Sequence, residues 1–169
     1  PNLFNSYRYV APSVSYPDGL GSSANGTNTN IVLDTTDKKF GTASYSFDGS
    51  AYVSTTETSL DFSVTDSFST AFWFKTTQTS EGGFVSRWNT SNNGWLVLKD
   101  SGTTASFRLS SNWSADAFRL TATDNAFSDD AWHNLVVTYD GTGETGVNMY
   151  LDGAVLTLVN TLSGTVGAI

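Results

Sequence analysis

Hydrophobic and polar residues alternate over short segments from about residue 31 onward, with turn residues between them. The clearest segment is residues 68–76, where three phenylalanines fall on one face and Trp73 and Lys75 fall on the other. A period of two predicts a β-strand, and aromatic residues on both faces favour a central strand. Further strands are predicted over residues 43–48, 51–55, 84–88, 94–99, 104–109, 118–123, 132–139, 147–151 and 154–158. About ten strands at this spacing predict an all-β sandwich or barrel.

Asp-Gly pairs mark the predicted tight turns. Asp48 and Gly49 stand between two predicted strands and indicate a hairpin of residues 43–48 with 51–55. Asp152 and Gly153 indicate a second hairpin that leads into residues 154–158. Aspartate tolerates a positive φ and glycine has no Cβ, which suits both central positions of such a turn.

The first thirty residues differ from the remainder of the chain. They hold all three prolines and a Gly/Ser/Asn/Thr tract without sustained alternation. We therefore expect an N-terminal arm and flexible lead-in over residues 1–30, followed by one domain over residues 31–169. The arm carries Phe4, Tyr7, Tyr9 and Tyr16, so we expect it to lie on this domain or on a neighbouring subunit.

Composition excludes several classes of function. Eight Lys and Arg residues against sixteen Asp and Glu residues leave a net charge of −8, which argues against nucleic-acid binding. The chain has no cysteine, hence no disulfide, thiolate zinc site or cysteine nucleophile, and its single histidine excludes a histidine-rich metal site. The longest apolar runs are about five residues, too short for insertion into a membrane.

The N-terminus has no recognisable signal peptide, since it lacks a basic segment followed by a long apolar one. Pro1 is consistent with removal of an initiator methionine, which would mean cytoplasmic synthesis without export. A fragment, or a mature chain after cleavage, is the alternative.

Three segments carry a resemblance to a known family. They are FGTASYSFDGSAYVS at residues 40–54, FSTAFWFKT at 68–76 and WHNLVVTYDGTGETGVNMYLDG at 132–153. Their order and spacing resemble the laminin-G-like domains of the concanavalin A-like lectin/glucanase superfamily. The resemblance spans roughly residues 31–160 and implies a jelly-roll sandwich of two antiparallel sheets.

One departure from the family concerns the C-terminal end. Family members continue past this last hairpin through closing strands, whereas this chain stops at Ile169. Either the fold is shortened, or residues 165–169 alone serve as the last strand. Alternatively, the closing strands belong to a longer chain of which this is a part, or a neighbouring chain supplies them. A missing strand would leave an exposed sheet edge that recruits partner subunits.

The resemblance also raises glycoside hydrolysis, which needs two carboxylates beside the scissile bond. The chain offers only Glu57, Glu81 and Glu144 as glutamates, all in predicted loops and none in a strand of alternating acids. His133 lies within a core strand pattern and is interpreted as a sheet-face residue. We therefore predict no catalytic residues and no enzyme.

A carbohydrate-binding rim is the favoured site. Trp88, Asn92 and Trp113 lie in or beside loop-rich stretches, where an indole can stack on a sugar ring and an amide can bond its hydroxyls. Trp95 is expected to point into the core, as Trp73 and Trp132 are. Residues Asn89 and Asn93 flank Asn92 in the same stretch.

Calcium is the candidate cofactor, because the family that the chain resembles commonly binds it at the sandwich rim. Asp100 and Asp116 border predicted strands and are the candidate ligands, with Asp124 as a further acid in such a position. Turn acids without any metal are the alternative.

These observations predict a non-enzymatic structural and recognition module. We expect a virion surface protein of the bacteriophage capsid-decoration or tail-fibre type, with possible sugar binding. Its partners would be other protein subunits, docked through the arm and a sheet edge in an oligomer or assembly, and a glycan. The alternative is a secreted or cell-surface carbohydrate-binding adhesin or lectin module from a longer chain.

Overall fold

The computed structural model describes residues 8–9, 27–54, 61–89, 93–112, 116–123 and 127–162. Within them the chain forms fourteen strands and one short 3₁₀ turn, Glu144–Gly146. The strands are β1 Arg8–Tyr9, β2 Thr27–Thr29, β3 Val32–Asp34, β4 Ser44–Ser46, β5 Tyr52–Ser54, β6 Phe68–Lys75, β7 Gly82–Trp88, β8 Gly94–Lys99, β9 Ala105–Asn112, β10 Asp116–Ala122, β11 His133–Tyr139, β12 Val147–Leu151, β13 Ala154–Val155 and β14 Leu158–Leu162.

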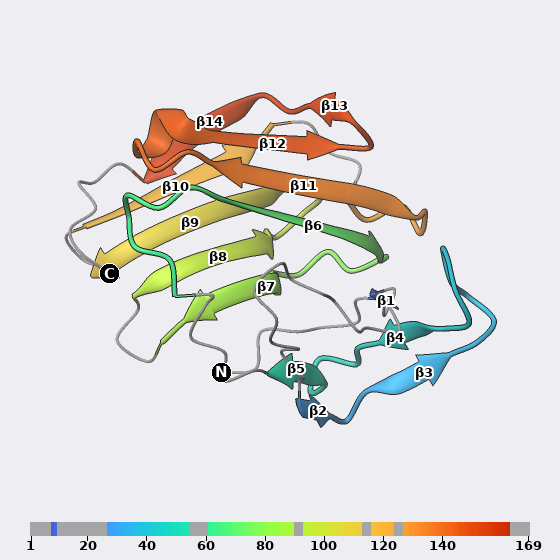
Figure 1. Cartoon of the computed structure of the whole chain (residues 1–169). Coiled ribbons are helices and arrows are strands. Elements are labelled where there is room, and N and C mark those ends of the chain that lie inside the picture. Colours follow the sequence, from blue (N-terminus) through green and yellow to red (C-terminus); the bar gives the residue numbers. More distant parts are fainter. Residues whose placement is uncertain are drawn as a thin grey trace.

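Two antiparallel sheets form the sandwich (Figure 1). The larger has the order β13-β12-β11-β6-β1-β4-β3, and the smaller has the order β14-β10-β9-β8-β7. Strands β2 and β5 form a separate two-stranded ribbon. The all-β, two-sheet antiparallel sandwich expected from the sequence is confirmed.

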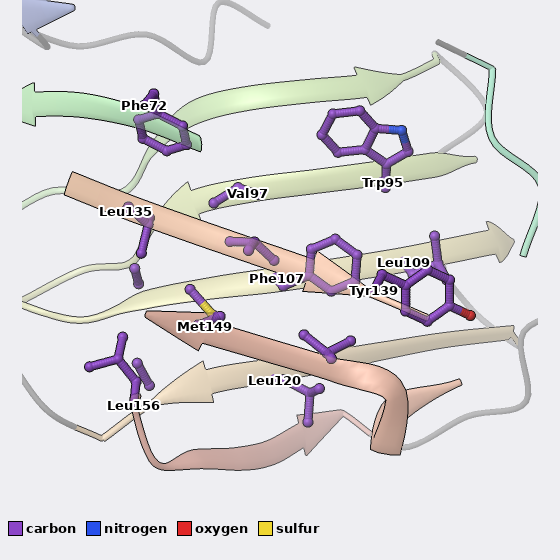
Figure 2. Packing of buried hydrophobic residues seen from close by; sticks show 14 of the residues in the cluster. Phe72, Trp95, Val97, Phe107, Leu109, Leu120, Leu135, Tyr139, Met149 and Leu156 are labelled. Atoms are coloured by element: carbon purple, nitrogen blue, oxygen red, sulfur yellow. The ribbon is translucent and has the colours of Figure 1, made fainter. Parts of the chain in front are cut away.

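The core lies between the two sheets, and it follows directly from the alternation along the strands. In β11 the burial alternates strictly, so that Leu135, Val137 and Tyr139 point inward. Figure 2 shows Tyr139 beside Phe107 and Leu109 of the smaller sheet, and all of these residues belong to one core cluster. Burying each such side chain contributes roughly 1.5–3 kcal/mol, so the aromatic and aliphatic interior is the main source of stability.

Part of the predicted arm lies in the larger sheet. Strand β1 is inserted between β6 and β4, with Arg8 opposite Lys75 on one side and Ser46 on the other. Strands β1 and β2 were not predicted because residues 1–30 show no sustained alternation, and β3 was not predicted because its alternation covers only three residues. Residues 1–7 and 10–26 lie outside the described residues, so the boundary between arm and domain at residue 30 stays a prediction.

The predicted hairpin around Asp48 and Gly49 is wrong. Strand β4 pairs with β1 and β3, whereas β5 pairs with β2 in the separate ribbon. The Asp48 carboxylate accepts hydrogen bonds from the backbone N–H groups of Ser50 at 2.8 Å and Ala51 at 3.0 Å. This side-chain turn redirects the chain between sheets, and Phe47 and Ala51 are buried together in a second small cluster.

The hairpin at Asp152 and Gly153 is confirmed. Leu151 is opposite Ala154, and φ is 52° at Asp152 and 85° at Gly153, as the turn requires. The predicted strand over residues 154–158 is interrupted, however. The chain leaves the larger sheet after Val155 and continues as β14, which pairs with β10 at the edge of the smaller sheet. Residues 165–169, considered above as a last strand, lie outside the described residues.

The tryptophans divide between core and surface. Trp95 is buried in the core, as expected. Trp73 is half-buried on the outer face of β6, and Trp132 is half-buried just before β11, so their expected core position is wrong. The loop between β3 and β4 supplies their partners: the Phe40 ring packs edge-on against Trp73 at 5.5 Å, and the Trp132 Nε1–H donates to Asp37 at 3.0 Å.

Candidate functional site

A small pocket opens at the end of the smaller sheet where β7 and β8 are joined. Its volume is about 170 Å³. Clefts that bury drug-sized ligands have roughly 300–1,000 Å³, so this pocket suits a single small ring or substituent. Its lining combines one carboxylate, one guanidinium, two amides and two aromatic rings, from Asp61, Phe62, Arg87, Asn89, Asn93, Gly94 and Trp95.

Trp95 forms the inner wall of the pocket. Its ring packs against Phe68 at 4.9 Å and Phe62 at 6.3 Å between ring centroids, because position 95 falls on the core-facing row of β8. Only 5% of the residue is exposed, and its Nε1–H has no hydrogen-bond partner among the described residues. Figure 2 shows the indole nitrogen on the side of the ring away from Val97, toward the end of the sheet.

Asp61 and Arg87 face each other at the mouth of the pocket. The Arg87 Nε donates to the Asp61 Oδ1, although the two residues are separated by 26 positions in the sequence. This hydrogen bond lowers the pKa of Asp61 below its ordinary value, so Asp61 is ionised at neutral pH. Nearly half of each side chain is exposed. Such a pair adds little to stability but offers both an acceptor and a donor to a ligand.

The loop between β7 and β8 is clamped at its base. The backbone N–H of Asn89 donates to the Asn93 carbonyl at 3.0 Å, and the Asn93 N–H donates to the Asn89 side chain at 3.1 Å. Gly94 has a φ of +125°, and a Cβ there would lie 1.8 Å from the Arg87 carbonyl oxygen. Only glycine fits this approach, so the pocket wall has a fixed backbone.

Comparison with family models shows to which protein superfamily the chain belongs. The model of the concanavalin A-like lectin/glucanases superfamily matches residues 47–166, more than two-thirds of the 169 residues. The chain belongs to this superfamily. The match is to its laminin-G-like branch, as the resemblance predicted. No curated protein and no solved structure matches the chain.

Membership of the superfamily supports a carbohydrate-binding or recognition module. Laminin-G-like domains are generally non-enzymatic binding modules and are typically extracellular. In the part of this laminin-G-like chain that the structure describes, no helix is long and apolar enough to cross a membrane.

The predicted sugar-binding residues meet the pocket only in part. Trp88 is half-buried at the end of β7, opposite Gly94, and does not line the pocket. Asn92 and Trp113 lie outside the described residues. Gly94 pairs with Ser110, so the ends of β9 and β10 that are joined to each other lie at the same end of the sheet as the pocket. Asn89 and Asn93, which flank Asn92 in the sequence, line the pocket. These predicted sugar contacts stay a prediction.

The two predicted calcium ligands are placed differently. Asp100 is buried, and its Oδ1 lies against the Arg119 guanidinium and 3.7 Å from the Arg108 Nη2. The positive charge of these two guanidinium groups disfavours a cation beside this carboxylate. The Asp116 side chain is outside the described set. Among the described residues no three acidic, histidine or cysteine side chains gather as a metal site. A calcium ion at Asp100 and Asp116 therefore stays an untested prediction.

Sequence reasoning missed Asp61, Phe62 and Arg87. Asp61 stands in a connector with no strand pattern, and no spacing in the sequence relates it to Arg87. Trp95 carries a core pattern, which hides that one edge of its ring also faces the pocket. The available signal was the cluster of asparagines between Trp88 and Trp95, two of which do line the pocket.

Proposed function

We propose that this laminin-G-like protein is a non-enzymatic carbohydrate-recognition module and that the pocket at the β7–β8 end holds one sugar residue. The observation that carries the proposal is the composition of the pocket wall. Asp61 accepts hydrogen bonds and the asparagine amides both accept and donate them, while Phe62 and Trp95 present apolar ring surface. A sugar has the same mixture, with hydroxyl groups around its rim and C–H groups on its faces.

We propose binding without catalysis because of the side chains that line this pocket. Glycoside hydrolysis needs a pair of carboxyl groups on either side of the scissile bond. Asp61 is the one carboxylate among the described residues that line the pocket. Glu81 lies elsewhere and pairs with Arg108 at 3.1 Å. Superfamily membership supports binding, and this arrangement supports binding without bond cleavage.

Glycan-array screening followed by calorimetry of the positive sugars tests the proposal. Asp61→Asn removes the charge at the pocket mouth and is expected to weaken binding by about tenfold or more, as loss of a charged hydrogen bond does. Asp66→Asn is the matched control: Asp66 accepts the Ser63 N–H at 2.8 Å in the same connector and does not line the pocket. Binding of no glycan, or equal binding by both variants, would overturn the proposal.

We also infer that the protein is a subunit of a surface assembly. The location expected from the sequence is the surface of a virion. The role in an assembly is supported by the exposed apolar residues on edge strands, Val32 and Leu33 on β3 and Val159 on β14. Among the described strands β3 and β14 are sheet edges, and exposed apolar edges of this kind favour association with other chains. Light scattering over a range of protein concentrations tests it: association that Leu33→Lys weakens supports the role, whereas a monomer throughout contradicts it. Mass spectrometry of purified particles tests the virion location.

A further inference from the structure

The indole N–H of Trp95 is a buried donor that lacks an acceptor among the described residues. Trp95 is 95% buried, so solvent does not reach it freely. Leaving such a donor unsatisfied costs about 1–3 kcal/mol, and buried polar groups in folded proteins are nearly always paired. The N–H therefore indicates a hydrogen-bond acceptor that enters the pocket from outside.

The side chains around this N–H indicate which chemical group of a ligand could accept its hydrogen bond. Phe62 stacks on Phe68 with ring centroids 4.6 Å apart and lies 6.3 Å from Trp95, which makes this part of the wall apolar. The Asp61 carboxylate, held by Arg87, is a hydrogen-bond acceptor in the same lining. The pocket thus presents a buried donor, an apolar surface and a fixed acceptor together.

We infer that the pocket selects a sugar that carries an acetamido group. This inference rests on the proposed function and names its ligand class. The acetamido carbonyl accepts from Trp95 Nε1–H, the methyl group packs on Phe62, and the amide N–H donates to Asp61. A plain sugar hydroxyl satisfies the indole N–H as well, but it brings a further donor into the apolar part of the pocket and has no methyl group to pack there.

Three other buried polar atoms without partners in the described part of the chain do not compete for this role. They are Gln78 Oε1, Asp100 Oδ2 and Ser110 Oγ. The first two are acceptors, the Ser110 hydroxyl can donate or accept, and none of the three residues lines this pocket. The Trp95 N–H is the donor in the lining that calls for an external acceptor.

Calorimetry with matched monosaccharides tests the inference on the unmodified protein. N-acetylglucosamine and N-acetylgalactosamine are expected to bind about fivefold or more tightly than glucose, galactose and glucosamine, which corresponds to one additional net hydrogen bond. In a ¹H–¹⁵N spectrum, the indole N–H resonance of Trp95 is expected to shift with the acetamido sugars.

The variant Trp95→Phe removes the donor but keeps an aromatic ring, and it assigns the indole resonance by its disappearance. It is expected to bind all these sugars with similar, weak affinity. Because Trp95 belongs to the core, a thermal melt must first establish that the variant folds. If it does not fold, Asp61→Ala serves in its place, since it removes the acceptor for the acetamido N–H outside the core and is expected to reduce the preference for acetamido sugars.

The outcomes separate the inference from the proposed function. Binding of plain and acetamido sugars with equal affinity, or an indole resonance that does not move at saturation, overturns the acetamido assignment and leaves sugar binding intact. Binding of no sugar overturns both. A preference for acetamido sugars that Trp95→Phe abolishes supports both.

Discussion

The imidazole Nδ1 of His133 lies 2.6 Å from the Oδ2 of Asp152. The other ring nitrogen, Nε2, lies 2.9 Å from the Oδ1 of Asp129, so that the ring is held between two carboxylates. Asp152 occupies the β12–β13 turn, and its Oδ1 also accepts the backbone N–H of Asn134 at 2.8 Å. His133 thereby fastens the hairpin turn and the loop before β11 to the start of that strand.

This arrangement predicts a pH-dependent stability. Burial by itself lowers the pKa of His133, but the hydrogen bonds to Asp152 and Asp129 outweigh burial and raise the pKa above its ordinary value of 6.5. The folded state then binds the proton more tightly than the unfolded chain. The stabilisation is complete below the unfolded pKa and is lost as the pH rises through the folded pKa. Thermal melts over roughly pH 5 to 9 should show the melting temperature falling across this window.

The variant His133→Gln should remove that pH dependence and lower the stability at acid pH by about 1–2 kcal/mol, since the carboxylates are half-exposed. Asp129 determines how the stability changes at acid pH. Hydrogen bonds from the Ala131 N–H and from His133 lower its pKa, so its contribution is lost as the pH falls through that lowered value. A His133→Gln melting profile that still parallels the wild type above neutrality would contradict the assignment.

Asp37 joins the β3–β4 loop to the outer face of the larger sheet. Its Oδ1 accepts the Trp132 Nε1–H at 3.0 Å, and its Oδ2 accepts from the Lys75 Nζ at 3.0 Å. Asp37→Ala should destabilise the fold by about 1–3 kcal/mol in urea unfolding, because it removes both bonds. Asp37→Asn keeps the acceptor for Trp132 and should cost about 1 kcal/mol or less, with a smaller loss at high salt. Equal losses for the two variants would show that the indole bond contributes nothing.

Gly94 sets the backbone of the pocket wall. Gly94→Ala would force a Cβ against the Arg87 carbonyl at a φ of +125°, and a loss of about 3 kcal/mol or more is expected. Gly102→Ala is the matched control, because Gly102 also has a positive φ, +85°, but a Cβ there meets nothing within 4 Å. It should cost only about 1 kcal/mol. Urea unfolding of both variants compares the steric clash with the backbone strain alone.

Lys99 is a fully buried lysine that fastens the β8–β9 turn. Its Nζ donates to the backbone carbonyls of Asp100 at 2.8 Å and Gly102 at 2.6 Å, and burial lowers its pKa. Lys99→Met leaves both carbonyls without this donor and should destabilise the protein by about 1–3 kcal/mol. Lys38→Met, at an exposed lysine that donates to the Thr35 carbonyl, should change stability by about 0.5 kcal/mol or less. If Lys99→Met leaves the stability unchanged, the β8–β9 turn does not depend on the ammonium group.

The strongest strands could be predicted because their information is local. The alternation in β6, β11 and β12 reports which side chains face the core. The Asp152–Gly153 pair needs only its own backbone preferences to make the turn. The predicted hairpin at Asp48 and Gly49 was wrong because the information in the sequence is only local. The turn residues were recognised, but no local signal says that the two flanking strands pair with different partners.

The sequence by itself determined the all-β class and the inward rows of the longest strands, because burial on a strand repeats every two residues and leaves a trace in the chain. The superfamily came from the resemblance of three ordered segments, residues 40–54, 68–76 and 132–153. Only the tertiary structure decided which sheet each strand joins, that Trp73 and Trp132 pack under the β3–β4 loop, and that Asp61 meets Arg87 beside Trp95. These depend on contacts between segments that are distant in the chain, and a single polar residue in a loop carries no periodic signal of the partner it will meet.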